Sequence, residues 1–118
     1  MLAFWLTCLL EAPWWLWCLF GERSARPERP RRRRRTVLLA LGLTLVLNLL
    51  THPVVWRVTN ADPTWRTWAW AELAAVLVEV LVAALVLSKS GVREPWVTAL
   101  LYAVGANAGS ALVGLVFF

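Results

Sequence analysis

Four polar side chains interrupt long apolar stretches of this sequence, each near the middle of its own stretch: Glu11, Asn48, Glu79 and Asn107. An acidic residue at the centre of a bilayer costs about 2.5–3.5 kcal/mol on insertion scales. Such residues face a protein interior or a water-lined cavity, where they mark proton and ion pathways. Because an apolar surrounding penalises the charged form, we expect at least one glutamate to be protonated at neutral pH. The pattern predicts a midplane carboxyl/amide site for a proton, a cation or a cationic small molecule.

The stretches that must position these residues cover about 2–20, 36–56, 67–87 and 95–118. Each holds about the 20 residues that cross a hydrocarbon core roughly 30 Å thick as a helix. With their short connections they account for nearly the whole chain. Residues 1–118 are therefore expected to form a single integral membrane domain, an all-α bundle of four transmembrane helices, with no room for a soluble catalytic domain.

The composition agrees with this class. Hydrophobic residues make up 60% of the chain, and its mean hydropathy is +0.64. A soluble domain is nearer 45–50% apolar. A soluble core of this length could not bury so many apolar side chains.

Basic residues are distributed unevenly between the connections. Of the 12 Lys and Arg residues, eight lie in the first connection, 21–35, two in the third (Lys89 and Arg93) and two in the second (Arg57 and Arg66). The first and third connections lie on one side of the membrane. That side therefore has eight plus two basic residues, and the other side has two. Since positively charged loops stay cytoplasmic, we expect both termini outside, in a bacterial cytoplasmic membrane.

The first connection ends in an uninterrupted arginine run: Arg31, Arg32, Arg33, Arg34 and Arg35. Beside a bilayer such a run fixes topology and attracts anionic lipid, by about 1 kcal/mol for each charge near the surface. Proline and like charge in 21–35 predict a basic cytoplasmic loop without packed structure. Nucleic acid is not an expected partner, because no recognition fold or base-stacking platform accompanies the run.

Further polar candidates flank the midplane residues. Thr51 shares a helical face with Asn48, and His52 lies one step round that helix. His52 and Glu72 lie about four and five residues from the outer ends of their stretches, so we predict a hydrogen-bonded pair near the outer mouth. Pro53 lacks a backbone donor and restricts the residue before it, which predicts a kink or a helix end within a turn of His52.

The two halves of the chain resemble each other. Glu11 is followed by Asn48-Leu-Leu-Thr51, and Glu79 is followed by Asn107-Ala-Gly-Ser110. This is the pattern of two helical hairpins related as a parallel repeat. In the last stretch, small residues recur every four positions, at Ala106, Ser110 and Gly114, which predicts a close helix-packing face.

Other site chemistries lack their residues. There is one histidine, and Cys8 and Cys18 are ten residues apart on one helix, so neither a metal site nor a disulfide is expected. Ser110 has no evident base nearby, and no glycine-rich phosphate loop exists. We expect neither an enzyme nor a bound cofactor.

Small bacterial polytopic membrane proteins show a pattern that this chain resembles: Glu11-x-Pro13, then Asn48-x-x-Thr51-His52-Pro53-x-x-Trp56, then Glu72, Glu79 and Asn107-x-x-Ser110. The resemblance covers most of the chain and implies only the fold and the compartment. The chain is also similar to small multidrug-resistance transporters in its length, its four spans and its first glutamate. Those transporters lack the Arg-rich first loop and the Thr-His-Pro segment, and their characteristic residues after the first glutamate are absent here.

Two functions of different class follow from the polar residues. The first is a small transporter or ion-conducting protein, which needs a homo-oligomer or a partner chain because four helices make a thin wall. The second is a non-catalytic membrane subunit or scaffold, whose polar core and small-residue face recognise a partner membrane protein. In the second case the Asn and Ser/Thr residues join helices, each contributing about 0.6–2 kcal/mol.

Overall fold

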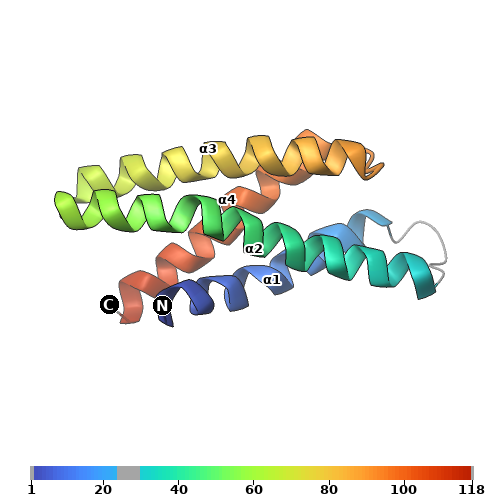
Figure 1. The fold of residues 1–118 in the computed structure, drawn as a ribbon, viewed down its shortest axis with the longest axis horizontal. Coiled ribbons are helices and arrows are strands. Elements are labelled where there is room, and N and C mark those ends of the chain that lie inside the picture. Colours follow the sequence, from blue (N-terminus) through green and yellow to red (C-terminus); the bar gives the residue numbers. More distant parts are fainter. Residues whose placement is uncertain (1, 24–29, 118) are drawn as a thin grey trace.

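The chain folds into four helices that pack side by side (Figure 1). The computed structural model describes residues 2–23 and 30–117, with side chains for 4–21, 31–109, 111 and 112. Its elements are α1 (Leu2–Arg23), α2 (Pro30–Ala61), α3 (Trp65–Lys89) and α4 (Pro95–Phe117), and the described part contains no strand. The predicted all-α helical bundle is confirmed.

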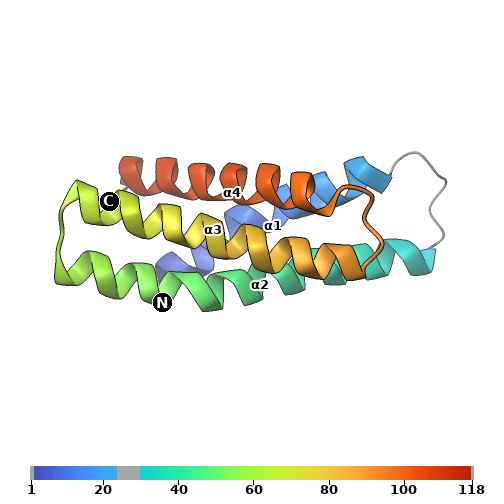
Figure 2. The same cartoon turned by 90° about the horizontal axis from the view of Figure 1, so that it is seen from above.

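Each helix contacts two neighbours, so that the four form a ring around a common axis. In the described residues, contacts join α1 to α2, α2 to α3, α3 to α4 and α4 to α1, and no contacts join the diagonal pairs. Figures 1 and 2 show the start of α1 and the end of α4 at the same end of the bundle as the α2–α3 turn, away from the α3–α4 connection. Side chains that point to the axis from any helix therefore meet in one interior.

Three helices of the described part are long and apolar enough to cross a membrane, over Phe4–Gly21, Arg31–Ala61 and Trp65–Lys89. Large apolar side chains cover the outside of the bundle: Leu9 is 71% exposed, Leu77 62% and Leu101 64%. Such a surface suits lipid and not water. The span at 95–118 stays a prediction, and α4 lies against α1 and α3 as that prediction requires.

The half of the bundle nearest the basic connections has a largely apolar interior. Its largest fully buried side chains include Trp15, Leu19, Leu87 and Tyr102, and the rings of Trp15 and Tyr102 are in contact. Small alanines from α2, α3 and α4 fill the remaining space. This packing closes the interior at the basic end.

The arginine run is helical, which corrects the predicted loop over 21–35. Helix α1 continues to Arg23, and α2 begins at Pro30, so only 24–29 lie outside the described residues. Proline suits the first position of a helix and arginine is a good helix former, while all five arginines are exposed and solvated. The arginine run, Lys89 and Arg93 lie at the end of the bundle opposite the termini. The location of the termini outside the cell and the contact of the arginines with anionic lipid stay predictions.

Helix α2 also continues past Pro53 to Ala61, so of the predicted kink or helix end near His52 the end is wrong, and the kink stays a prediction. Pro53 is exposed, and its missing N–H removes only one helical hydrogen bond. Figure 1 shows α2 changing direction near its middle. The helix therefore carries Thr51, His52 and Thr59 along the same wall of the interior.

Two local signals mark the ends of α3. Thr64 caps α3 by accepting a hydrogen bond from the Thr67 backbone N–H at 3.2 Å. Gly91, after α3, has a φ of +74°, a left-handed conformation that favours glycine. These two signals fix where α3 begins and ends.

A close contact between α1 and α4 lies at Gly105 and was not predicted. A Cβ atom at that position would lie 2.5–2.6 Å from atoms of the Trp14 indole, so α1 and α4 could not keep this contact with a larger residue. Ala106 in the predicted packing stripe is buried, whereas the side-chain positions of Ser110 and Gly114 lie outside the described residues. Gly105 therefore sets the distance between α1 and α4.

Candidate functional site

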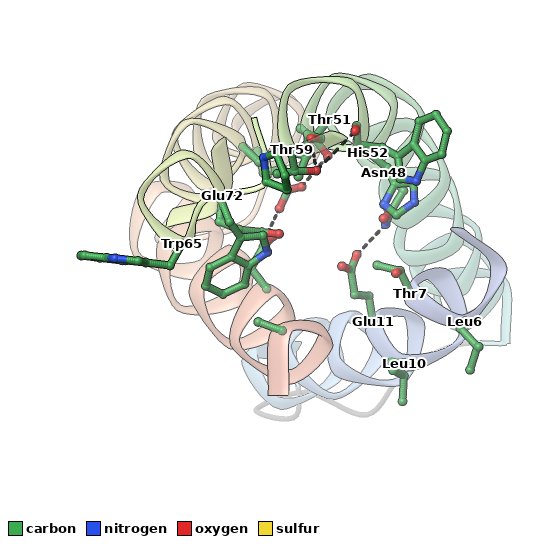
Figure 3. A pocket seen from close by; sticks show the side chains of 18 of the residues that line it. Leu6, Thr7, Leu10, Glu11, Asn48, Thr51, His52, Thr59, Trp65 and Glu72 are labelled. Atoms are coloured by element: carbon green, nitrogen blue, oxygen red, sulfur yellow. Dashed lines mark hydrogen bonds between the residues drawn. The ribbon is translucent and has the colours of Figure 1, made fainter. Parts of the chain in front are cut away.

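The first buried carboxyl belongs to Glu11 in α1. It is 3% exposed, and its Oε2 accepts a hydrogen bond from Nδ2 of Asn48 in α2 at 2.6 Å. Figure 3 shows Glu11 directed into the ring of helices, with a dashed line to the Asn48 amide. The predicted approach of the first glutamate to an asparagine is confirmed.

The second buried carboxyl, Glu79 in α3, accepts hydrogen bonds on both oxygens. Thr51 in α2 donates its hydroxyl to Oε1 at 2.9 Å, and Asn107 in α4 donates Nδ2 to Oε2 at 2.5 Å. Glu79 is also 3% exposed. Both glutamates thus point into the bundle and not towards lipid, as the cost of a lipid-facing carboxyl predicted.

Each donor in this site has a second acceptor in its own helix. Asn48, Thr51 and Asn107 contact the backbone carbonyls one turn earlier, at 3.0, 2.9 and 2.8 Å respectively. A donor that loses its carboxyl partner therefore keeps one hydrogen bond, to a carbonyl of its own helix, which limits the cost of the change.

Neither buried glutamate has a basic partner. All the Lys and Arg side chains that the structure describes are exposed and lie near the ends of the helices. A carboxylate in an apolar interior is costly unless it is paired. Each glutamate therefore has to hold a proton or attract a cation from outside the chain.

A cavity of about 590 Å³ leads from the α2–α3 turn to both glutamates, and we name it the vestibule. Its walls come from all four helices and include Thr64 at the turn, Glu72 half-way down, and Glu11, Asn48 and Glu79 at its base. The apolar packing of Trp15 and Tyr102 lies beyond that base. The site is thus reached from the end at the α2–α3 turn, and apolar packing fills the interior towards the basic end. Figure 3 shows the labelled lining residues around the ring of helices.

No protein-family model, no curated protein and no solved structure matches the chain. The absence of a family agrees with the sequence pattern, which fits no characterised family. The geometry of the vestibule is therefore the basis for assigning a function.

One face of α3 forms a continuous wall of the vestibule. Its members alternate three and four residues apart, the spacing of one helical face: Trp65, Trp68, Glu72, Ala75 and Glu79. Figure 3 shows the Trp65 ring directed away from the interior. Trp68 is the next indole of this face that lines the vestibule. Glu72 has no hydrogen-bond partner in the part of the chain that the structure describes.

His52 and Glu72 both line the vestibule, but the predicted hydrogen bond between them is absent from the described residues. The His52 ring instead packs edge-on against Phe4 of α1, with ring centroids 5.8 Å apart and planes at 62°. His52 therefore makes an aromatic contact through its ring, whereas the predicted pair required a hydrogen bond through a ring nitrogen. Glu72 remains available to another partner.

Tyr102 was missed as a site residue. Its hydroxyl donates to the backbone carbonyl of Glu11 at 3.2 Å, although the ring lies in the apolar half of the bundle. The signal was its polar tip within an apolar stretch, in the only tyrosine of the chain. Tyr102 thus connects the apolar packing at the basic end to the helix turn that carries the first carboxyl.

Proposed function

We propose that this chain is a small integral membrane protein whose midplane carboxyl/amide site binds and translocates a proton, a cation or a cationic small molecule. One observation carries the proposal: two buried glutamates without basic partners lie at the base of a cavity that opens at one end of the bundle. A group that must be neutralised and can be reached from one side is suited to exchange.

The amide and hydroxyl donors around Glu79 are compatible with exchange, because each also contacts a carbonyl of its own helix. When a cation approaches Glu79, Thr51 and Asn107 keep their hydrogen bonds to the carbonyls of Leu47 and Ala103. The carboxyl releases its proton and its oxygens turn to the cation. A neutral side chain would join the helices at lower cost than a glutamate, which favours exchange over a purely structural role.

Translocation further requires that the apolar end opens. Tyr102 and Trp15 fill the interior between the site and the basic end, and the Tyr102 hydroxyl holds the α1 backbone at Glu11. We assign these two residues to the inner barrier. Occupation of the site by a cation changes the environment of the Glu11 turn and hence the contact that Tyr102 makes with it.

A second function is a membrane subunit that recognises a partner membrane protein. It is favoured by one observation: the polar contacts bridge all four neighbouring helix pairs, since Asn48, Thr51, Asn107 and Tyr102 each donate to another helix. Such contacts stabilise a bundle by about 0.6 kcal/mol each in lipid. In this case the glutamates would stay protonated and bind nothing.

Flux through reconstituted protein tests the proposed function. Liposomes are prepared with the full chain in the bilayer, a pH-sensitive dye inside and an imposed pH gradient. The gradient should be lost when a cation salt is added outside whose ions do not cross the bilayer unaided. Glu11→Gln combined with Glu79→Gln should abolish this loss, because the amide cannot release a proton. Trp96→Leu, a lipid-exposed change, is the matched control. A gradient that decays equally with the double variant would contradict the proposal and favour the subunit.

A further inference from the structure

The charge of the vestibule selects the sign of its ligand. Three of its lining side chains are carboxyls, Glu11, Glu72 and Glu79, and none of the described lining residues is Lys or Arg. Once these carboxyls release their protons, an anion would be repelled and a cation attracted in this surrounding of low polarity. His52 is the one other titratable side chain among the described lining residues. The vestibule therefore fits a cation better than an anion or a zwitterion.

The volume of the vestibule selects the size of that cation. A volume of 590 Å³ lies within the range of about 300–1,000 Å³ that small-molecule sites occupy. A bare metal ion would leave most of it unfilled. In the described part of the chain no group of three or more His, Cys, Asp or Glu side chains is placed to hold a metal ion. Space and ligand geometry therefore favour an organic cation.

Two residues one turn apart on α3 fit the two parts of such a ligand. Trp68 lines the vestibule and is 37% exposed, and Glu72 follows it by four residues on the same face. A cation is attracted to the face of an indole and to a carboxylate at the same time. Val55 and Ala75 add apolar lining next to them. Glu72 has no competing hydrogen-bond partner in the described residues.

We propose, resting on the proposed function, that the vestibule binds an organic cation with an apolar body, whose charged centre lies between Trp68 and Glu72. The apolar body occupies the space beside Val55 and Ala75 and reaches towards Glu79. Glu72 thus receives the ligand from the mouth, and a deeper glutamate releases its proton when the charged centre moves inward from Glu72 to that carboxyl. This assigns Glu72 and Trp68 as binding residues separate from the midplane pairs.

Binding of benzyltrimethylammonium to the full chain in lipid nanodiscs tests this proposal, with neutral (2,2-dimethylpropyl)benzene as its uncharged isostere and potassium as the small cation. After subtraction of empty nanodiscs, the ammonium should bind at least tenfold more tightly than the isostere. Glu72→Gln should weaken it at least tenfold and Trp68→Leu three- to tenfold, while Trp68→Tyr, which keeps an aromatic face, should bind nearly as the natural chain. Glu94→Gln and Trp96→Leu, at the other end of the bundle, are the matched controls.

The outcomes separate this proposal from the one on which it rests. Equal binding of the ammonium and its isostere, or unchanged binding by both Glu72→Gln and Trp68→Leu, would overturn the organic-cation assignment. A third outcome is that potassium causes proton release that needs Glu79, while the ammonium does not bind. This outcome would overturn the organic-cation assignment and leave the proposed function standing. If no cation binds, and Glu79→Gln behaves as the natural chain throughout, both proposals are overturned.

Discussion

Glu79→Gln should abolish cation binding at the midplane while the free energy of unfolding stays within about 1 kcal/mol of the natural value. Glutamine has the shape of the protonated acid, so its oxygen can accept from Asn107 as Oε2 does. Its amide can donate to Thr51, whose hydroxyl then donates to the Leu47 carbonyl alone. What glutamine cannot do is lose a proton. Cation titration and thermal unfolding of the same nanodisc sample measure both quantities.

Glu79→Leu is the companion change that separates binding from stability. Leucine removes both acceptors, so α3 loses its polar contacts with α2 and α4, at a cost of about 1–3 kcal/mol from two interhelical hydrogen bonds. Val78→Leu, at the neighbouring lipid-exposed position, is the control. If Glu79→Gln keeps full cation binding and only Glu79→Leu has an effect, Glu79 joins helices and does no exchange.

Blocking the vestibule should stop exchange without touching any polar residue. Ala75 lies on the vestibule wall between Glu72 and Glu79 and is 6% exposed. Ala75→Phe places a ring in the cavity, so we expect cation-dependent proton flux to fall at least tenfold because the path to the midplane is filled. The 590 Å³ cavity has room for that ring, which limits overpacking.

The adjacent alanine provides the control for this experiment. Ala74 is exposed on the outside of α3, so Ala74→Phe adds the same ring to the lipid-facing side. It should leave the flux unchanged. Should Ala75→Phe prove unstable, Ala75→Leu adds a smaller plug at the same position. Full flux through a folded Ala75→Phe variant would show that the ligand reaches the midplane by another route.

The sequence predicted the bundle and the direction of its glutamates because both follow from strong, local terms. The length of an apolar stretch fixes the number of helical turns, and a carboxyl near the midplane is too costly to face lipid. That argument holds whatever the details of packing. It therefore placed Glu11 and Glu79 inside, each near an asparagine.

The partners within the site could not be predicted in the same way. Thr51 donates to Glu79 across the two halves of the chain, and that choice depends on how α2 is rotated between α1 and α3. His52 packs on Phe4 for the same reason. Rotation is set by many weak contacts, such as the fit of Trp14 against Gly105, which no spacing rule reveals.

Helix ends were the other error, and they have a different cause. A helix end is favoured by charge repulsion along Arg31–Arg35 and by the missing donor of Pro53. Each of these costs less free energy than is gained from the helical hydrogen bonds and the packing on either side, so the helix continues. A helix that is held by its neighbours over many turns continues through one unfavourable residue. Sequence rules for ends weigh the local cost alone.

The central claim is that a buried glutamate exchanges its proton for a cation, and the most direct measurement is the number of protons released per cation bound. Calorimetric titration in two buffers of different ionisation enthalpy gives that number for the chain in nanodiscs. We predict release of protons by the natural chain and none by the chain carrying both Glu11→Gln and Glu79→Gln. Cation binding that releases no protons, or a release that survives the loss of both carboxyls, would contradict the account.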